Sequence, residues 1–175
     1  KYKDTQFFTE KYMINTLVES LHIDTKSKII DPACGGGNFL LYSFEVLAGQ
    51  VADKGNSNKA KYAIDNLYGY EIDRFLAHVA SFNLKMKALA FISKEDDVSI
   101  DIFNNCHPRI FYPQKDSIPG FLDTEWNKQF VVNYDNREVL RLIDVFDGAN
   151  VVVTNPPFRT IKGMPAEQKE YLQKH

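Results

Sequence analysis

The sequence predicts an α/β fold in which helices flank a mostly parallel sheet. Two short apolar runs, Lys26–Asp31 and Leu67–Asp73, end in carboxylates and are each followed by a segment with helical character. A third run, Val151–Thr154, is continuously apolar up to its threonine, a pattern typical of a strand in a parallel sheet. Strands that alternate with helices in this way indicate parallel pairing.

The size and composition of the chain fit one globular domain. It has 175 residues, of which 44% are hydrophobic and 25% charged, enough for a substantial core. We expect no membrane partner, because no apolar run approaches the length that spans a bilayer and no secretory signal pattern opens the chain. The two cysteines, Cys34 and Cys106, suggest neither a disulfide framework nor a metal site, and predict a cytoplasmic location. A net charge of −2 is not the signature of an autonomous nucleic-acid binder.

The segment Asp31–Leu40 predicts a ligand site. Pro32 restricts Asp31 to extended geometry, and the three glycines that follow allow positive φ and a close approach of ligand to backbone. The next helix, expected from Asn38 to about Ala52, would point its unpaired amides at that ligand. A dinucleotide fingerprint would need glycine in place of Leu40, which disfavours that class. The alternative is a tight turn without a ligand.

The segment before the first helix favours a helix cap. Thr9 is suited to be the N-cap of a helix whose apolar face is Tyr12, Met13, Thr16, Leu17 and Leu21.

Other elements are predicted by pattern and composition alone. They are a polar loop at Asp53–Asn58, a helical piece through Ala60 and Ile64, a helix at Arg74–Ala90, a strand around Ile100–Phe103 and a hairpin of Phe130–Val132 with Val139–Val145.

Glu71 follows the second predicted strand. An acid at the carboxyl end of a strand, downstream of a glycine-rich turn, is placed to accept hydrogen bonds from ribose hydroxyls. The alternative role is to cap the next helix, and we assign that role to Asp73.

The third apolar run ends in Asn155-Pro156-Pro157-Phe158. Each proline holds the preceding residue extended and lacks an amide hydrogen, so the corner is rigid and rich in acceptors. The side-chain oxygen of Asn155 and the carbonyl of Pro156 could together bind the two N–H groups of an exocyclic aromatic amine. Aligning such an amine with an activated methyl group requires neither a nucleophilic cysteine nor a metal. The alternative is a rigid turn after a strand.

Four motifs occur in a characteristic order: Phe-Phe-Thr at 7–9, Asp-Pro-Ala-Cys-Gly-Gly-Gly-Asn-Phe at 31–39, Glu-Ile-Asp at 71–73 and Asn-Pro-Pro-Phe at 155–158. Together they resemble the gamma-type DNA adenine-N6 methyltransferases of restriction–modification systems. The resemblance implies a Rossmann-like class I fold that uses S-adenosylmethionine, with the target adenine flipped out of the duplex. The sequence has Glu10 where the family usually has proline, and Phe158 where tyrosine is commoner.

The resemblance also implies roles for individual residues. The cofactor contacts would be Phe7, Phe8, Thr9, Asp31, Pro32, Ala33, Cys34, Gly35, Gly37, Asn38, Phe39, Glu71 and Ile72. The catalytic group would be Asn155, Pro156, Pro157 and Phe158, with the phenylalanine stacking on the flipped base. The polar residue that contacts the cofactor's adenine is left open among Asp101, Asn104 and Asn105.

The resemblance covers nearly the whole chain and implies that residues 1–175 are the amino-terminal part of one catalytic domain. It implies an insertion at about 104–145 and a target-recognition region outside the chain, so the fragment alone would methylate weakly or not at all. DNA would be bound through the full-length protein, with a restriction or specificity subunit or domain as a further partner. The alternatives are a non-catalytic cofactor- or nucleic-acid-binding module, and a protein-glutamine or RNA methyltransferase with the same corner.

Overall fold

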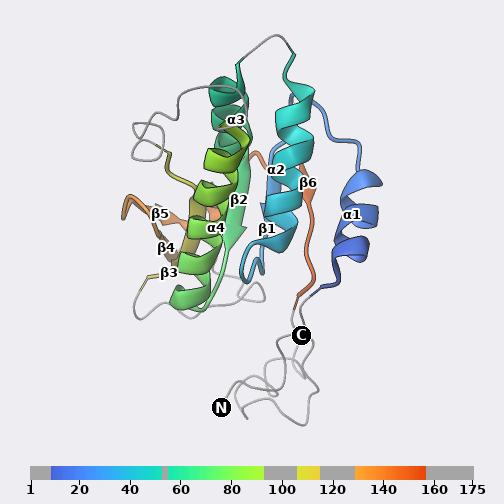
Figure 1. Cartoon of the computed structure of the whole chain (residues 1–175). Coiled ribbons are helices and arrows are strands. Elements are labelled where there is room, and N and C mark those ends of the chain that lie inside the picture. The colour runs from blue at the N-terminus through green and yellow to red at the C-terminus, as the bar shows by residue number, and fades with distance from the viewer. Residues whose placement is uncertain (1–8, 53–54, 93–105, 115–128, 157–175) are drawn as a thin grey trace.

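The computed structural model describes residues 9–52, 55–92, 106–114 and 129–156, and its centre is a six-stranded sheet in the order β5-β4-β3-β2-β1-β6 (Figure 1). The strands are β1 (Ile29–Asp31), β2 (Leu67–Tyr70), β3 (Arg109–Pro113), β4 (Phe130–Asn133), β5 (Val139–Arg141) and β6 (Val151–Val152). Strands β3, β2, β1 and β6 are parallel, and β4 and β5 extend the sheet as an antiparallel hairpin. The predicted α/β fold with a mostly parallel sheet is therefore confirmed.

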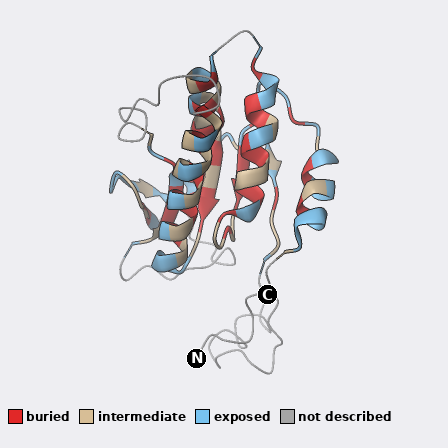
Figure 2. Ribbon diagram, in the orientation of Figure 1, coloured by how far each residue is buried: buried red, intermediate tan, exposed pale blue. Residues whose placement is uncertain are grey.

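Helices cover the sheet unequally. They are α1 (Lys11–Glu19), α2 (Asn38–Gln50), α3 (Asn56–Asp65), α4 (Arg74–Ile92) and the short α6 (Leu142–Phe146). Helices α2, α3 and α4 lie over one face, with α1 beside α2 (Figure 1). Figure 2 shows buried residues gathered in the strands and on the helix surfaces that face them.

The two faces of the sheet bury different sets of residues because side chains alternate along a strand. Ile29 belongs to the cluster beneath the large helices. Ile30 belongs to the cluster on the opposite face, where α6 contributes Leu142 and Val145. The strand β1 is thus enclosed on both sides, and all three of its residues are buried.

Several predicted elements are confirmed in place. The two strands that end in carboxylates are β1 and β2, and the helices after them are α2 and α4. The hairpin is confirmed as β4 and β5, but its second arm ends at Arg141 and α6 follows. Its turn forms because the Asn133 side chain accepts hydrogen bonds from the amides of Asp135 (2.8 Å) and Asn136 (3.2 Å). The helix α3 begins at Asn56, inside the predicted polar loop.

A strand that the sequence analysis did not predict pairs with β2 on the side away from β1. It is β3, Arg109–Pro113, whereas the predicted strand at Ile100–Phe103 lies outside the described residues. Pro108 precedes β3 and Pro113 is its last residue; prolines are turn signals in a sequence, which hides the buried pair Ile110 and Phe111 inside the strand. Together with β4 and β5, this strand places part of the predicted insertion within the sheet.

The predicted orientation of the first helix is wrong. Tyr12 and Leu17 are 69% and 47% exposed, and the residues that α1 buries are Ile14 and Val18. The predicted stripe and the buried stripe both fit helical spacing in so short a helix. Packing against α2 buries the stripe with the β-branched side chains Ile14 and Val18. Thr9 is not the N-cap either. Glu10 occupies that position and makes no side-chain capping bond.

The strand β6 is less buried than predicted. Val152 is 62% exposed, because β6 is the last strand of the described sheet and pairs only with β1. Its neighbour Val153 is buried in the main core cluster and continues the path of the strand. The continuously apolar sequence therefore marks a strand, but not one covered on both faces by the described residues.

Helix α4 is long and apolar enough to cross a membrane by length and composition, contrary to the prediction that no segment is. In the structure one face of α4 is buried in the main core cluster. Its buried residues lie against the sheet and neighbouring helices, and they are Ala77, Ala80, Ser81, Leu84, Ala88 and Ile92. The small alanines on this face let α4 pack closely on the sheet.

Candidate functional site

Loops that follow three adjacent parallel strands meet at one edge of the sheet, which we call the carboxyl rim. Its members are Asp31, the last residue of β1, with Pro32–Gly37 after it, Glu71–Asp73 after β2 and Val153–Pro156 after β6. Strand β1 lies between the other two, so its loop is flanked by both. The amide of Val153 donates to the carbonyl of Ile30 (3.0 Å), which continues the β1–β6 pairing toward the rim. Carboxyl ends of strands in such sheets are where ligands bind.

The glycine turn is held from α4. Gly37 has φ of 88°, and a Cβ added there would lie 3.2 Å from Cβ of Ala80, so only glycine fits without strain. The Asn83 side chain donates to the carbonyl of Gly36 (3.0 Å). By contrast, a Cβ added at Gly35, which has φ of 51°, would meet no atom within 4 Å. The turn therefore packs tightly against α4 at Gly37 and leaves open space beside Gly35.

Helix α2 begins directly at this turn. Its N-cap is Gly37, which supplies no side-chain hydrogen bond to the first amides of the helix. The first turn of a helix has N–H groups without intrahelical partners, and these attract electronegative atoms of a ligand. Asn38 is exposed at this end and Phe39 is buried. The start of α2 thus presents donors to the carboxyl rim.

Glu71 braces the glycine turn. Its Oε2 accepts from the Gly35 amide (2.8 Å) and its Oε1 from the Asp73 amide (2.9 Å). Burial raises the pKa of Glu71, while these backbone hydrogen bonds act in the opposite direction. A carboxylate has about four acceptor positions, so further donors can still bind. The predicted cap is confirmed, since Oδ1 of Asp73 accepts from the amide of Phe75 (2.8 Å) at the start of α4.

Asp31 lies deeper in the rim. It is 1% exposed, and burial raises its pKa from 3.8 to about 6, while a hydrogen bond from the Ala33 amide (3.1 Å) opposes the shift. The negative charge of Glu71 adds to the increase. The Thr154 hydroxyl lies close by, and its interaction with the carboxyl acts to lower the pKa of Asp31. Two neighbouring acids therefore make the rim favourable for a cation.

Cys34 is a packing residue. It is 5% exposed, and burial raises the pKa of its thiol well above the usual value. A protonated, buried thiol is a poor nucleophile.

Asn155 lies at the end of the β6 loop and contacts the amino-terminal segment. Its Nδ2 donates to Oγ1 of Thr9 (2.9 Å), although the two residues are 146 positions apart. Both side chains are partly buried, and Pro156 beyond them is exposed. Figure 1 shows the segment that enters α1 lying beside the chain that leaves β6. The structure thus brings Thr9 and Asn155 together at the carboxyl rim.

The structure describes most of the predicted site residues. The positions from Asp31 to Phe39, together with Thr9, Glu71, Ile72, Asn155 and Pro156, lie at the carboxyl rim or next to it. Ile72 is 57% exposed, beside the Glu71 carboxylate. Those outside the described residues are Phe7, Phe8, Asp101, Asn104, Asn105, Pro157 and Phe158. Their predicted roles stay predictions.

Sequence reasoning missed two residues that support the carboxyl rim and one at the opposite edge of the sheet. Ala80 and Asn83 support the glycine turn from α4, and no motif marks them. Asn150 joins β1 to β6: its Oδ1 accepts from the Lys28 amide (2.8 Å), and its Nδ2 donates to the Lys26 carbonyl (3.1 Å). A polar residue directly before an apolar strand is the only sequence signal for such a contact.

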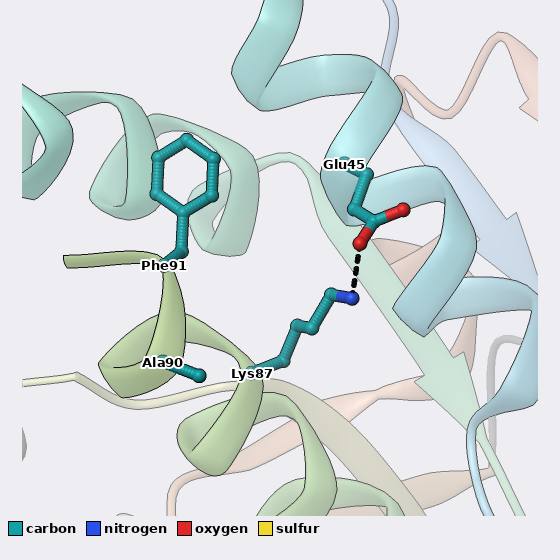
Figure 3. Close-up of a pocket in the computed structure, with 4 residues that line it drawn as sticks. All are labelled: Glu45, Lys87, Ala90 and Phe91. Carbon is teal, nitrogen blue, oxygen red and sulfur yellow. Dashed lines mark hydrogen bonds and ion pairs between the residues drawn. The ribbon is translucent and has the colours of Figure 1, made fainter. Parts of the chain in front are cut away.

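A cavity of about 60 Å³ lies elsewhere, between α2 and α4 (Figure 3). It is lined by Glu45, Lys87, Ala90 and Phe91, and an ion pair joins Lys87 to Glu45 across it. Ligand pockets measure several hundred Å³, so this cavity is too small for a nucleotide. No cluster of metal-ligating side chains occurs in the described part of the chain.

The glycine turn, the acid after the second strand and the sheet order define a Rossmann-like class I methyltransferase domain. A family model described as "MmeI, DNA-methyltransferase domain" matches residues 8–175, and the chain belongs to this family. It is therefore a DNA-methyltransferase domain.

One solved structure is also similar to the chain: a nuclease-deletion mutant of the Type ISP restriction-modification enzyme LlaGI in complex with a DNA substrate mimic. The sequence identity is 18% and the TM-score 0.43. The match covers 54% of this chain, which spans 9% of the length of that protein.

Proposed function

We propose that the carboxyl rim binds S-adenosylmethionine and directs methyl transfer to the exocyclic N6 amine of adenine in DNA. The observation that carries the proposal is the position of Asp31 and Asn155 after adjacent parallel strands, β1 and β6. A cofactor held over the first loop would lie beside a base held by the second. The family description supports DNA rather than protein or RNA as the substrate.

The residues present fit the cofactor. Gly35 leaves open space at the turn, and α2 begins without a side-chain cap, so both accept a close ligand. The Glu71 carboxylate has free acceptor positions for ribose hydroxyls, and the exposed Ile72 offers an apolar surface for an adenine ring. The buried Asp31 favours a positive charge nearby. When bound, S-adenosylmethionine supplies an activated methyl group.

The residues of the β6 loop would hold the target amine. Asn155 offers its side-chain oxygen and Pro156 its carbonyl, and together these acceptors match the two N–H donors of an exocyclic amine. Gripping both hydrogens directs the nitrogen lone pair toward the methyl donor. The protein's contribution is alignment, which reduces the entropy cost of the reaction. The exposed position of Pro156 leaves this corner accessible to a flipped base.

The motif order further supports a role in a restriction–modification system, in which a restriction or specificity subunit or domain would be a partner. Nucleoside analysis tests the proposal. The intact protein is incubated with methyl-labelled S-adenosylmethionine and unmethylated chromosomal DNA, which is then digested and separated. We expect label in N6-methyldeoxyadenosine. Label in a cytosine product would refute adenine as the target, and cofactor binding without any transfer would favour a non-catalytic binding module.

A further inference from the structure

Thr9 and Asn155 form a contact that the fold sets up from two directions. Asn155 follows β6, whose path is fixed by the hydrogen bond between the Val153 amide and the Ile30 carbonyl. Thr9 lies just before α1, which is anchored in the main core by Ile14 and Val18. The Asn155 Nδ2 to Thr9 Oγ1 distance is 2.9 Å. The contact therefore joins two parts of the framework and not two free loops.

The direction of this hydrogen bond matters for an asparagine. Its amide has donors on one branch and an acceptor on the other, and rotation about the last bond exchanges them. The bond to Thr9 engages the nitrogen branch, which leaves Oδ1 on the opposite branch. Thr9 is free to act in this way, because the N-cap position of α1 belongs to Glu10.

We infer that Thr9 is a positioning residue for methyl transfer: its hydroxyl holds the Asn155 amide so that Oδ1 faces the target amine. The inference rests on the proposed function, and it gives Thr9 a role toward the substrate in addition to the predicted cofactor contact. Both roles are compatible, since a hydroxyl that accepts one hydrogen bond keeps its own hydrogen to donate.

Conservative variants of the intact protein test the inference. Thr9→Val removes the hydroxyl at nearly constant shape, Thr9→Ser keeps it, and Thr16→Val makes the same change at an exposed position within α1. Methyl transfer to unmethylated chromosomal DNA gives kcat and KM, and calorimetry gives the Kd for S-adenosylmethionine. We expect Thr9→Val to lower kcat, measured at saturating S-adenosylmethionine, about tenfold, the value of one hydrogen bond. Loss of the predicted cofactor contact would instead raise the Kd for S-adenosylmethionine without lowering kcat at saturation. Thr9→Ser and Thr16→Val should keep near wild-type kcat.

Two results would overturn the inference. One is a wild-type kcat in Thr9→Val; the other is a rise in cofactor Kd that accounts for the whole loss, which would make Thr9 a cofactor contact only. A double-mutant cycle distinguishes failure of the inference about Thr9 from failure of the proposed function. If Thr9→Val and Asn155→Ala lower the melting temperature less together than the sum of their single effects, the contact exists. An inactive wild type with that coupling would refute the methyl transfer and this role in it, but not the contact.

Discussion

The Glu71 carboxylate accepts a hydrogen bond from the Gly35 amide at 2.8 Å, so the acid after β2 holds the loop after β1. The predicted role of Glu71 was toward a ligand alone. In the structure the same side chain also shapes the glycine turn, and a second oxygen is tied to the Asp73 amide. Cofactor binding and loop geometry are thereby linked through one residue.

Replacing Glu71 tests this link. Glu71→Ala should weaken S-adenosylmethionine binding on the order of ten- to a hundredfold, because hydrogen bonds to a charged acceptor are lost and the turn loses its brace. Calorimetric titration of the intact protein measures the Kd. Glu45→Ala is the matched control, since Glu45 is exposed on α2 and pairs with Lys87 away from the rim. A Kd within twofold of wild type in Glu71→Ala would be inconsistent with the proposed cofactor site.

Asp31 makes stability depend on pH. Its pKa is about 6 in the folded chain and 3.8 in the reference state, so between these values the folded protein holds the extra proton. Raising the pH through this window therefore lowers the free energy of unfolding, by up to about 3 kcal/mol. Asp31→Asn should flatten the dependence, leaving a smaller slope of the same sign from the raised pKa of Glu71. Urea unfolding at a series of pH values measures it; equal slopes in both proteins would contradict the assignment.

Two glycines at opposite ends of α2 should respond oppositely to alanine. Gly37→Ala places a Cβ at φ of 88° and 3.2 Å from Ala80, and should destabilise the fold by roughly 1–3 kcal/mol. Gly49→Ala lies within α2, where a Cβ meets no atom within 4 Å. It should stabilise by roughly 0.5–1 kcal/mol, since alanine favours helix. Urea denaturation compares them, and destabilisation of equal size at both positions would exclude the local explanation.

Asp135 ties the hairpin turn to α4. Its carboxylate contacts the Lys85 ammonium (2.5 Å) and Nδ1 of His107, and the Asp135 and Lys85 side chains are each 14% exposed. Asp135→Ala should cost on the order of 2 kcal/mol, between the values for exposed and buried pairs. Asp144→Ala, which breaks an exposed pair with Arg141, should cost clearly less, because solvent screens that pair. Equal losses of stability in the two variants would show that burial does not strengthen the Asp135 contacts.

The sequence predicted the core of the fold because its signals are local. The order of β1, α2, β2 and α4 follows from apolar runs, glycines and carboxylates that lie within a few residues of each other. The predicted site residues in those loops lie together at the carboxyl rim for the same reason. The motif around Asn155 was found because two prolines restrict the backbone whatever surrounds it.

What could not be predicted depends on distant parts of the chain. The buried face of α1 is selected by packing on α2, since two stripes satisfy the same spacing. The exposure of Val152 depends on its place at the end of the described sheet. The hydroxyl of Thr9 fits a helix cap by local rules, but it meets Asn155 only once the sheet has formed. Asn83 supports the glycine turn from another helix, which no local pattern reveals.

The central claim is that Asn155 and Pro156 grip the target amine while the β1 and β2 loops hold the cofactor. The most direct measurement pairs the methyl transfer rate with cofactor affinity in Asn155→Ala of the intact protein. The account predicts that transfer of label to DNA falls by on the order of a hundredfold or more, through lost alignment, while the Kd for S-adenosylmethionine stays within about twofold of wild type. DNA methylation at the wild-type rate with alanine at this position would contradict it.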